Sequence, residues 1–449
     1  MTLQRTTITA ESTTTHTAPA GAERTSSHLS STTIFEERES VIRSYCRSFP
    51  ALFSTAKGAL LNDADGRTWI DFLAGAGALN YGHNHDFLKA ALIAYIESDG
   101  VSHALDLHTE AKAAFLTAFT QHVLEPRGLD YKVQFTGPTG TNAVEVALKI
   151  ARKATGRTGI FAFMGGYHGH SLGSLAITAN KEHRAAAGTA LDGATFLPFP
   201  GGPTSGLDTL GYLRSILADG HSGIETPAGI IVETVQAEGG VNVAPIEWLQ
   251  ELRAICDDHG IVFIVDEIQT GCGRTGPFFS FERAGIVPDV VTVSKSISGY
   301  GLPMAITLLR PELDLWQPAE HTGTFRGNNL AFVTATAALE LFDEIGLSEK
   351  VAADAELVEA TLRRDVGSLD PGIEIRGLGL IWGVDTAGID PTGALAKRIG
   401  ARCFDDGLII ERTGRNDTVL KLLPPLTIDR ETLLAGIGIL AAATRSCLS

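Results

Sequence analysis

Two oppositely charged side chains, Asp266 and Lys295, directly follow apolar stretches that are typical of buried strands. Residues 261–265 (IVFIV) lead into Asp266, and residues 290–294 (VVTVS) lead into Lys295. Strands this apolar are usual in parallel sheets covered on both faces, where ligands bind beyond the carboxyl ends of the strands. We therefore expect the carboxylate and the amine to meet at one ligand-binding edge of a sheet.

The two side chains admit a structural and a catalytic interpretation. The structural one is a buried salt bridge, but desolvation makes such a pair a weak stabiliser. The catalytic one is a site for pyridoxal phosphate, which needs a lysine that bonds to it covalently and an aspartate that keeps its pyridine nitrogen protonated. Its phosphate would suit the glycine turn at residues 137–142 (GPTGTN), because the amides that open a helix bind anions. We favour this second interpretation and expect pyridoxal phosphate as the cofactor.

The chain must supply a sheet that positions these residues, and its hydrophobic pattern predicts one. From about residue 110 to residue 330, short apolar runs alternate with helical patterns, which is typical of an α/β fold with a mostly parallel sheet. Residues 331–449 predict a smaller α+β domain. A hairpin at residues 58–71 belongs to residues 34–109, which we expect to form the N-terminal part of that small domain and a linker. The Thr- and Ser-rich residues 1–33 predict a disordered extension.

Composition restricts the partners that the chain can have. Thirty-six basic and 52 acidic side chains give a formal net charge of -16, which disfavours binding to nucleic acids and anionic membranes. The five cysteines are scattered singly and are expected to be reduced thiols. We expect no metal, since His83 and His85 lack a third ligand. No apolar run reaches the roughly 20 residues of a membrane span, so a cytoplasmic location is expected, with a transit peptide as the alternative for the extension.

Two longer motifs resemble the signature of the class III aminotransferases. They are residues 265–276 (VDEIQTGCGRTG) and residues 288–295 (PDVVTVSK), which contain Asp266 and Lys295 in the family's order. The resemblance covers the chain from about Ile34 to its C-terminus. It implies a fold type I enzyme dependent on pyridoxal phosphate, with a large domain on a mostly parallel sheet of seven strands and a small α+β domain. It also implies an active site between the subunits of a homodimer or a dimer of dimers.

The resemblance further implies a set of residues around the cofactor. Lys295 and Asp266 would be the catalytic pair, Tyr167 would stack on the cofactor ring, and Gln269 would bind its phenolic oxygen. Thr324, in residues 323–329 (GTFRGNN), would reach the phosphate bound by the partner subunit. The full set of expected cofactor contacts is Gly140, Thr141, Tyr167, His168, Glu233, Asp266, Gln269, Lys295 and Thr324.

Two further positions concern the substrate. Residues 233–240 (ETVQAEGG) resemble a family segment whose second glutamate pairs with an arginine that otherwise binds the α-carboxylate of glutamate. Glu238 takes the place of that glutamate, and Lys421 stands where many relatives have the arginine, so both are candidate substrate contacts. His170 also stands where several relatives have an arginine. Because a lysine lacks the planar pair of donors of an arginine, the relatives' recognition of carboxylates cannot simply be copied onto this chain.

Within the class, residues 35–40 (FEERES), 75–84 (GAGALNYGHN) and 294–303 (SKSISGYGLP) resemble the diaminobutyrate–2-oxoglutarate aminotransferases of ectoine-type pathways. Such an enzyme reversibly moves the amino group of L-glutamate to L-aspartate 4-semialdehyde, giving L-2,4-diaminobutyrate and 2-oxoglutarate. One alternative is another ω-aminotransferase, acting on γ-aminobutyrate, ornithine or a related amine. The others are a cofactor-binding protein without turnover and a serine hydrolase, since residues 169–173 (GHSLG) match the nucleophile-elbow pattern around Ser171.

Overall fold

The structure, a computed structural model, describes residues 33–449. The extension expected over residues 1–33 therefore lies outside the described residues, except for its last residue. The chain divides into two compact units, one that ends at Leu52 and one that runs from Phe53 to Ser449. The described part of the first unit contains two short helices, α1 (Thr33–Arg38) and α2 (Tyr45–Ser48). All sheets of the described chain lie in the second unit.

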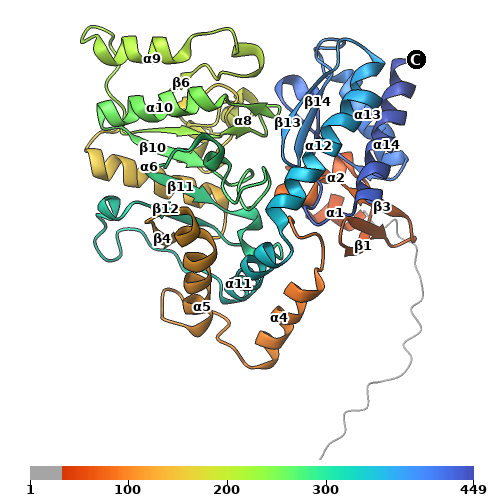
Figure 1. Cartoon of the computed structure of the whole chain (residues 1–449), viewed down its shortest axis with the longest axis horizontal. Helices are drawn as coiled ribbons and strands as arrows, with labels where there is room; N and C mark the ends of the chain where they lie inside the picture. The colour runs from red at the N-terminus through yellow and green to blue at the C-terminus, as the bar shows by residue number, and fades with distance from the viewer. Residues whose placement is uncertain (1–32) are drawn as a thin grey trace, which may run out of the picture. The chain divides into compact units, whose positions relative to one another are not determined.

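The largest sheet of the described chain has seven strands and belongs to the second unit (Figure 1). Its strand order is β4-β12-β11-β10-β7-β5-β6, and all neighbours are parallel except that β12 is antiparallel to both β11 and β4. The strands are β4 (Lys132–Phe135), β5 (Ile160–Phe163), β6 (Ala194–Leu197), β7 (Gly229–Val232), β10 (Val262–Asp266), β11 (Val290–Val293) and β12 (Ile306–Leu309). The predicted α/β fold with a mostly parallel sheet is confirmed.

Both faces of this sheet are covered, because alternate residues of each strand point to opposite sides. Ile264 of β10 belongs to a buried cluster with Val144 of α6 (Gly140–Thr155). The next residue back along the strand, Phe263, belongs to a different cluster, which contains Leu252 of α10 (Ile246–His259). This double covering explains why strands such as β5, β7 and β10 are apolar along almost their whole length and why polar residues gather at their ends.

Two smaller sheets have four strands each, in the orders β13-β14-β17-β16 and β1-β2-β3-β15. Their strands are β1 (Phe53–Lys57), β2 (Leu60–Asp63), β3 (Thr68–Asp71), β13 (Glu374–Leu378), β14 (Ile381–Asp385), β15 (Leu408–Ile409), β16 (Glu411–Thr413) and β17 (Val419–Leu422). The predicted hairpin is present as β2 and β3, and β3 pairs in parallel with β15 from the C-terminal part. The division into domains at residues 109 and 330 stays a prediction.

A two-stranded ladder of β8 (Val235–Gln236) and β9 (Asn242–Val243) follows β7. The remaining α-helices are α3 (Ala74–Gly77), α4 (Asp86–Glu97), α5 (Glu110–Phe119), α7 (Leu172–Ala176), α8 (Lys181–Ala185), α9 (Thr209–Ala218), α11 (Asn329–Glu344), α12 (Leu347–Asp365), α13 (Ala394–Asp405) and α14 (Arg430–Leu448). By length and composition alone, α14 could cross a membrane. Its residues Leu433, Ile437 and Leu440 are fully buried in the main hydrophobic cluster, so α14 serves here as a core helix.

Candidate active site

Asp266 ends β10 with a side chain that is almost wholly buried. One carboxylate oxygen, Oδ2, lies 2.7 Å from Nδ1 of His168. The other, Oδ1, accepts hydrogen bonds from Thr292 Oγ1 at 3.0 Å and from the amide of Ile268 at 3.1 Å. Thr292 is the residue of β11 that pairs with Asp266 in the sheet. The carboxylate is therefore fixed in one orientation by a neighbouring strand and by an imidazole.

His168 is equally buried and makes a carboxylate–imidazole pair with Asp266. Burial lowers the pKa of His168, but the hydrogen bond to Asp266 and the charge of its carboxylate outweigh burial and raise the pKa overall. Thr178 Oγ1 accepts from the amide of His168 at 3.0 Å, which anchors the backbone at this point. The pair therefore presents an oriented carboxylate, held by an imidazole, at the edge of the sheet.

Lys295 follows the neighbouring strand β11 and begins a single 3₁₀ turn. Its φ of 52° lies in the left-handed region, which a residue with a side chain rarely adopts unless the surroundings require it. Burial lowers the pKa of its amine, with a further lowering by Lys421, against carboxylates that raise it, first among them Glu238. Among the described residues its amine has no hydrogen-bond or ion-pair partner. The salt bridge to Asp266 considered above is therefore not formed, because Asp266 pairs with His168 instead.

Gly140 and Thr141 open α6, a 16-residue helix whose N-cap, Thr139, makes no side-chain capping bond. Within the described chain, the amides of Gly140 and Thr141 have no acceptor. Gly169 lies directly against this turn, and a Cβ atom there would come within 2.5 Å of Thr141 Oγ1. Two free amides at the positive end of a long helix suit a phosphate group.

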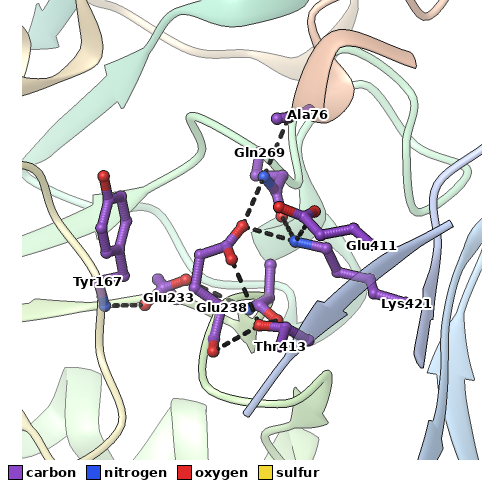
Figure 2. A network of polar contacts seen from close by, with 9 residues as sticks. Ala76, Tyr167, Glu233, Glu238, Gln269, Glu411, Thr413 and Lys421 are labelled. Atoms are coloured by element: carbon purple, nitrogen blue, oxygen red, sulfur yellow. Dashed lines mark hydrogen bonds and ion pairs between the residues drawn. The ribbon is translucent and has the colours of Figure 1, made fainter. Parts of the chain in front are cut away.

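Glu233, directly after β7, anchors the segment that carries Tyr167 (Figure 2). Its Oε1 accepts from the amide of Tyr167 at 2.9 Å, and its Oε2 accepts from the amide of Ala237 at 3.3 Å. Burial raises the pKa of Glu233 to about 7. Burial also raises the pKa of Tyr167 to about 12, with contributions from Glu238 and Glu233, so its phenol is protonated at neutral pH.

A buried ion cluster lies at the ends of β8 and β16, and we call its four members, Glu238, Gln269, Glu411 and Lys421, the Lys421 cluster (Figure 2). The Lys421 ammonium lies 2.5 Å from Glu238 Oε1, 3.0 Å from Glu411 Oε2 and 3.2 Å from Gln269 Oε1. Gln269 Nε2 in turn donates to Glu238 Oε1 at 3.2 Å and to the carbonyl of Ala76 at 3.0 Å. The cluster thus ties together three segments that are far apart in the sequence.

Glu238 and Lys421 hold each other in the ionised form. Burial raises the pKa of Glu238, but the charges of Lys421 and Lys295 and two hydrogen bonds outweigh burial and lower the pKa to about 2. Burial lowers the pKa of Lys421, but Glu238 and Glu411 outweigh it and raise the pKa above its ordinary value. Lys421 is therefore a fully buried cation with two carboxylate partners.

The structure brings together most of the residues that the sequence singled out. Thr324 is the exception, since it lies in an exposed turn before α11 and its side chain makes no hydrogen bond within the described chain. The sequence did not identify Glu411 and Thr292 as residues of the site. A usable signal for Glu411 was present, because it follows the apolar run 408–410 in the way that Asp266 follows its own strand.

Ser171 does not have the surroundings of a hydrolase nucleophile. Its Oγ lies 2.5 Å from Glu145 Oε1 and 2.6 Å from Thr141 Oγ1, and among the described residues no histidine binds it. The strand before it, β5, already ends at Phe163, whereas a nucleophile elbow follows its strand directly. The Ser171 hydroxyl therefore bonds to two residues of α6 and stabilises the start of that helix.

Comparison with known proteins settles the family. The Aminotransferase class-III family model matches residues 43–444. The chain belongs to the class III aminotransferases. A relative from Wolinella succinogenes, named diaminobutyrate–2-oxoglutarate transaminase, is 53% identical over 411 residues, which cover 91% of this chain and 95% of that protein. A relative of the same name from Vibrio cholerae is 52% identical over 411 residues and covers 91% of this chain and 98% of its own.

The fold agrees with solved structures of other aminotransferases. An ornithine aminotransferase from Toxoplasma gondii, described with partial occupancy of pyridoxal phosphate at its active site, has a TM-score of 0.79 and 25% identity. The alignment covers 92% of this chain and 93% of that one. This chain is thus an aminotransferase of small amino and keto acids with pyridoxal phosphate as its cofactor. The unpaired amine of Lys295, the free amides of α6 and the buried Asp266 fit the aldehyde, the phosphate and the pyridine nitrogen of that group.

Proposed function

We propose that this aminotransferase reversibly moves the amino group of L-glutamate to L-aspartate 4-semialdehyde, giving L-2,4-diaminobutyrate and 2-oxoglutarate. The observation that carries the proposal is the 53% identity, over nearly the whole length of both chains, to a protein named for this reaction. The similarity to an ornithine aminotransferase is much lower, at 25% identity. We therefore prefer diaminobutyrate over ornithine or γ-aminobutyrate as the amine.

In this proposal the cofactor, when bound, supplies an electron sink that stabilises negative charge on the substrate carbon next to the amine. Asp266, held by His168 and Thr292, would keep the pyridine nitrogen protonated. Lys295 would hold the cofactor covalently. Its Nζ, when free, would accept the proton that the substrate carbon loses, a role that suits an amine whose pKa burial has lowered.

The other expected contacts would orient the cofactor. The free amides of Gly140 and Thr141 would bind its phosphate, and the Tyr167 ring would stack on it, with the Tyr167 backbone anchored by Glu233. Gln269 would bind the phenolic oxygen of the cofactor, while its Oε1 would still accept the hydrogen bond from Lys421.

The side chain of Thr324 makes no hydrogen bond within the described part of this chain, and we assign it to the phosphate bound by the partner subunit. This assignment predicts a homodimer or a dimer of dimers, in which each site is completed by two chains. A cytoplasmic location fits the five free cysteines and the formal net charge of -16.

The two amino donors differ in the groups on the carbon that reacts, and so in what the Lys421 cluster would have to bind. The reacting carbon of glutamate carries a carboxylate, whereas the reacting carbon of diaminobutyrate carries only hydrogens. We assign Lys421 as the group that binds the glutamate carboxylate, and Glu238 as the group that covers Lys421 when no such carboxylate is present.

The test combines cofactor-loaded protein with 2-oxoglutarate and, in separate reactions, L-2,4-diaminobutyrate, γ-aminobutyrate and L-ornithine, and quantifies the glutamate formed. We expect diaminobutyrate to give the highest kcat/KM. A preference for either of the other two amines would refute the proposed substrate and leave the family assignment intact. The variant Lys295→Ala is the control. If it formed glutamate at the wild-type rate, the glutamate would not come from this site.

A further inference from the structure

Lys295 has a backbone conformation that its surroundings must maintain. Its φ of 52° is in the left-handed region, and it is the first residue of the 3₁₀ turn Lys295–Ser298. A residue with a side chain keeps such a conformation only where the structure around it holds it there. The residue before it, Ser294, donates from its Oγ to the carbonyl of Met304 at 2.8 Å, which ties the start of the turn to the residues before β12. The residue after it, Ser296, is the second anchor.

Ser296 ties the turn to a loop that lies far away in the sequence. Its Oγ accepts a hydrogen bond from the amide of Asn80, 216 residues earlier in the chain, at 2.9 Å. The same hydroxyl donates to the carbonyl of Gly77 at 3.1 Å. Ser296 and Asn80 are both buried, and a buried donor or acceptor that loses its partner is costly. The hydroxyl therefore holds the turn against this loop.

The loop is itself fixed to the segment that follows Asp266. Asn80 Oδ1 accepts from Nη2 of the fully buried Arg274 at 2.6 Å. Gln269 Nε2 donates to the carbonyl of Ala76 in the same loop at 3.0 Å (Figure 2). Through Ser296, the 3₁₀ turn is thus connected to the segment that begins at Asp266, in addition to the pairing of the two strands in the sheet.

This connection bears on the alignment of two groups in the site. Asp266 would hold the pyridine nitrogen of the cofactor, and Lys295 Nζ has to reach the aldehyde carbon of the same molecule. When they react, a double bond forms between Nζ and that carbon, and the aldehyde oxygen leaves as water, so the rate depends on how well the two atoms are aligned. We propose that Ser296 is a positioning residue, whose hydroxyl holds Lys295 in the conformation from which its amine reaches the aldehyde. The inference rests on the role proposed for Lys295.

The test is the variant Ser296→Ala, which removes the hydroxyl. The cofactor is first removed from the purified enzyme, pyridoxal phosphate is added back, and the formation of the covalent bond is followed by absorbance. In parallel, equilibrium dialysis measures the binding of pyridoxine phosphate, which has an alcohol in place of the aldehyde and cannot bond to the lysine.

We expect Ser296→Ala to form the covalent bond at least about tenfold more slowly than the wild type, because a small misplacement of a reacting atom is costly in rate. The affinity for pyridoxine phosphate should be unchanged, since that ligand does not need the amine. A general structural defect would weaken its binding as much as it slows the bond. Such a parallel loss, or an unchanged rate, would overturn the proposal.

Ser298→Ala is the matched control. Ser298 lies in the same turn, its side chain is fully buried, and its hydroxyl has no hydrogen-bond partner among the described residues. This variant should leave both the rate and the binding unchanged. A rate as low as that of Ser296→Ala would assign the effect to the packing of the turn and overturn the proposal.

A second variant keeps the test decisive if Ser296→Ala does not fold. Ser296→Cys fills the site with a thiol, which is only a weak donor and acceptor of hydrogen bonds. It should slow the formation of the covalent bond by a smaller factor and leave the binding of pyridoxine phosphate unchanged. A wild-type rate in the folded Ser296→Cys protein would overturn the proposal.

The failure of this proposal can be distinguished from failure of the proposed function. If Lys295→Ala forms the covalent bond at the wild-type rate, the role proposed for Lys295 fails, and this inference fails with it. If the bond requires Lys295 but forms equally fast without the Ser296 hydroxyl, only this inference fails. The assay contains no amino donor, so its outcome does not depend on which substrate the enzyme uses.

Discussion

The stability of the enzyme should depend strongly on Lys421, and Lys421→Met is the most direct way to measure this. The substitution removes the ammonium that contacts Glu238 and Glu411 while it retains most of the volume of the side chain. Removing one partner of a buried ion pair typically costs about 3 to 5 kcal/mol, because the remaining charge is left unpaired in a medium that solvates it poorly.

The pKa of Glu238 gives a second route to the same magnitude. Its pKa is lowered from 4.5 to about 2, which corresponds to about 3 kcal/mol of stability. Because the pKa in the folded state is the lower one, this contribution is fully present above pH 4.5 and is lost as the pH falls toward 2. Between pH 7 and pH 5 the wild type should therefore show little change from this source.

In Lys421→Met the pH dependence of stability should have the opposite sign. Without the ammonium, burial raises the pKa of Glu238 above its ordinary value, so the penalty is largest at high pH and is relieved as protonation proceeds toward lower pH. Urea unfolding followed by circular dichroism, at fixed protein concentration, should show a loss of about 3 kcal/mol or more at pH 7 and a smaller loss at pH 5.

The matched control is Lys132→Met, which removes the lysine of an exposed pair with Asp314 and should cost less than about 1 kcal/mol. A loss for Lys421→Met no greater than that of the control, or one that is the same at both pH values, would refute the reasoning.

Three further variants probe the site. Lys295→Ala should abolish steady turnover and leave the circular dichroism spectrum unchanged, and near-normal turnover would rule out Lys295 as the catalytic lysine. Asp266→Ala should retain the cofactor but lower kcat by about a hundredfold or more, because the pyridine nitrogen loses its anionic partner; wild-type kcat would contradict the placement of Asp266. Gly169→Ala places a Cβ atom within 2.5 Å of Thr141 Oγ1, so equilibrium dialysis should show at least about tenfold weaker binding of pyridoxal phosphate. Unchanged binding would separate Gly169 and Thr141 from the phosphate site.

The sequence was sufficient to predict the sheet and the edge at which Asp266 and Lys295 lie. That prediction rests on local patterns, since an apolar run followed by a charged residue identifies both a buried strand and its end. The sequence could not predict the partner of Asp266. His168 lies 98 residues earlier in the chain, and only the three-dimensional arrangement brings its ring to the carboxylate.

The Lys421 cluster shows the same limit more clearly. Glu238 and Lys421 were found through the resemblance to the family, but Glu411 was not, because its contact depends on the register between two strands of only a few residues. Short strands leave weak signals in a sequence, and a shift of one residue would turn Glu411 away from Lys421. The left-handed conformation of Lys295 is likewise a property of the folded chain that no pattern predicts.

The pairing of β3 with β15 has a consequence for how the protein is made. Trp69 Nε1 donates a hydrogen bond to the carbonyl of Phe404 across 335 residues, next to the point where the two strands meet. During synthesis, the hairpin of β2 and β3 leaves the ribosome long before β15 is made. Until then the edge of β3 that pairs with β15 is unpaired. Lys421 lies 12 residues after the end of β15, so this sheet and the ion pairs of the active site are completed at nearly the same late stage of translation.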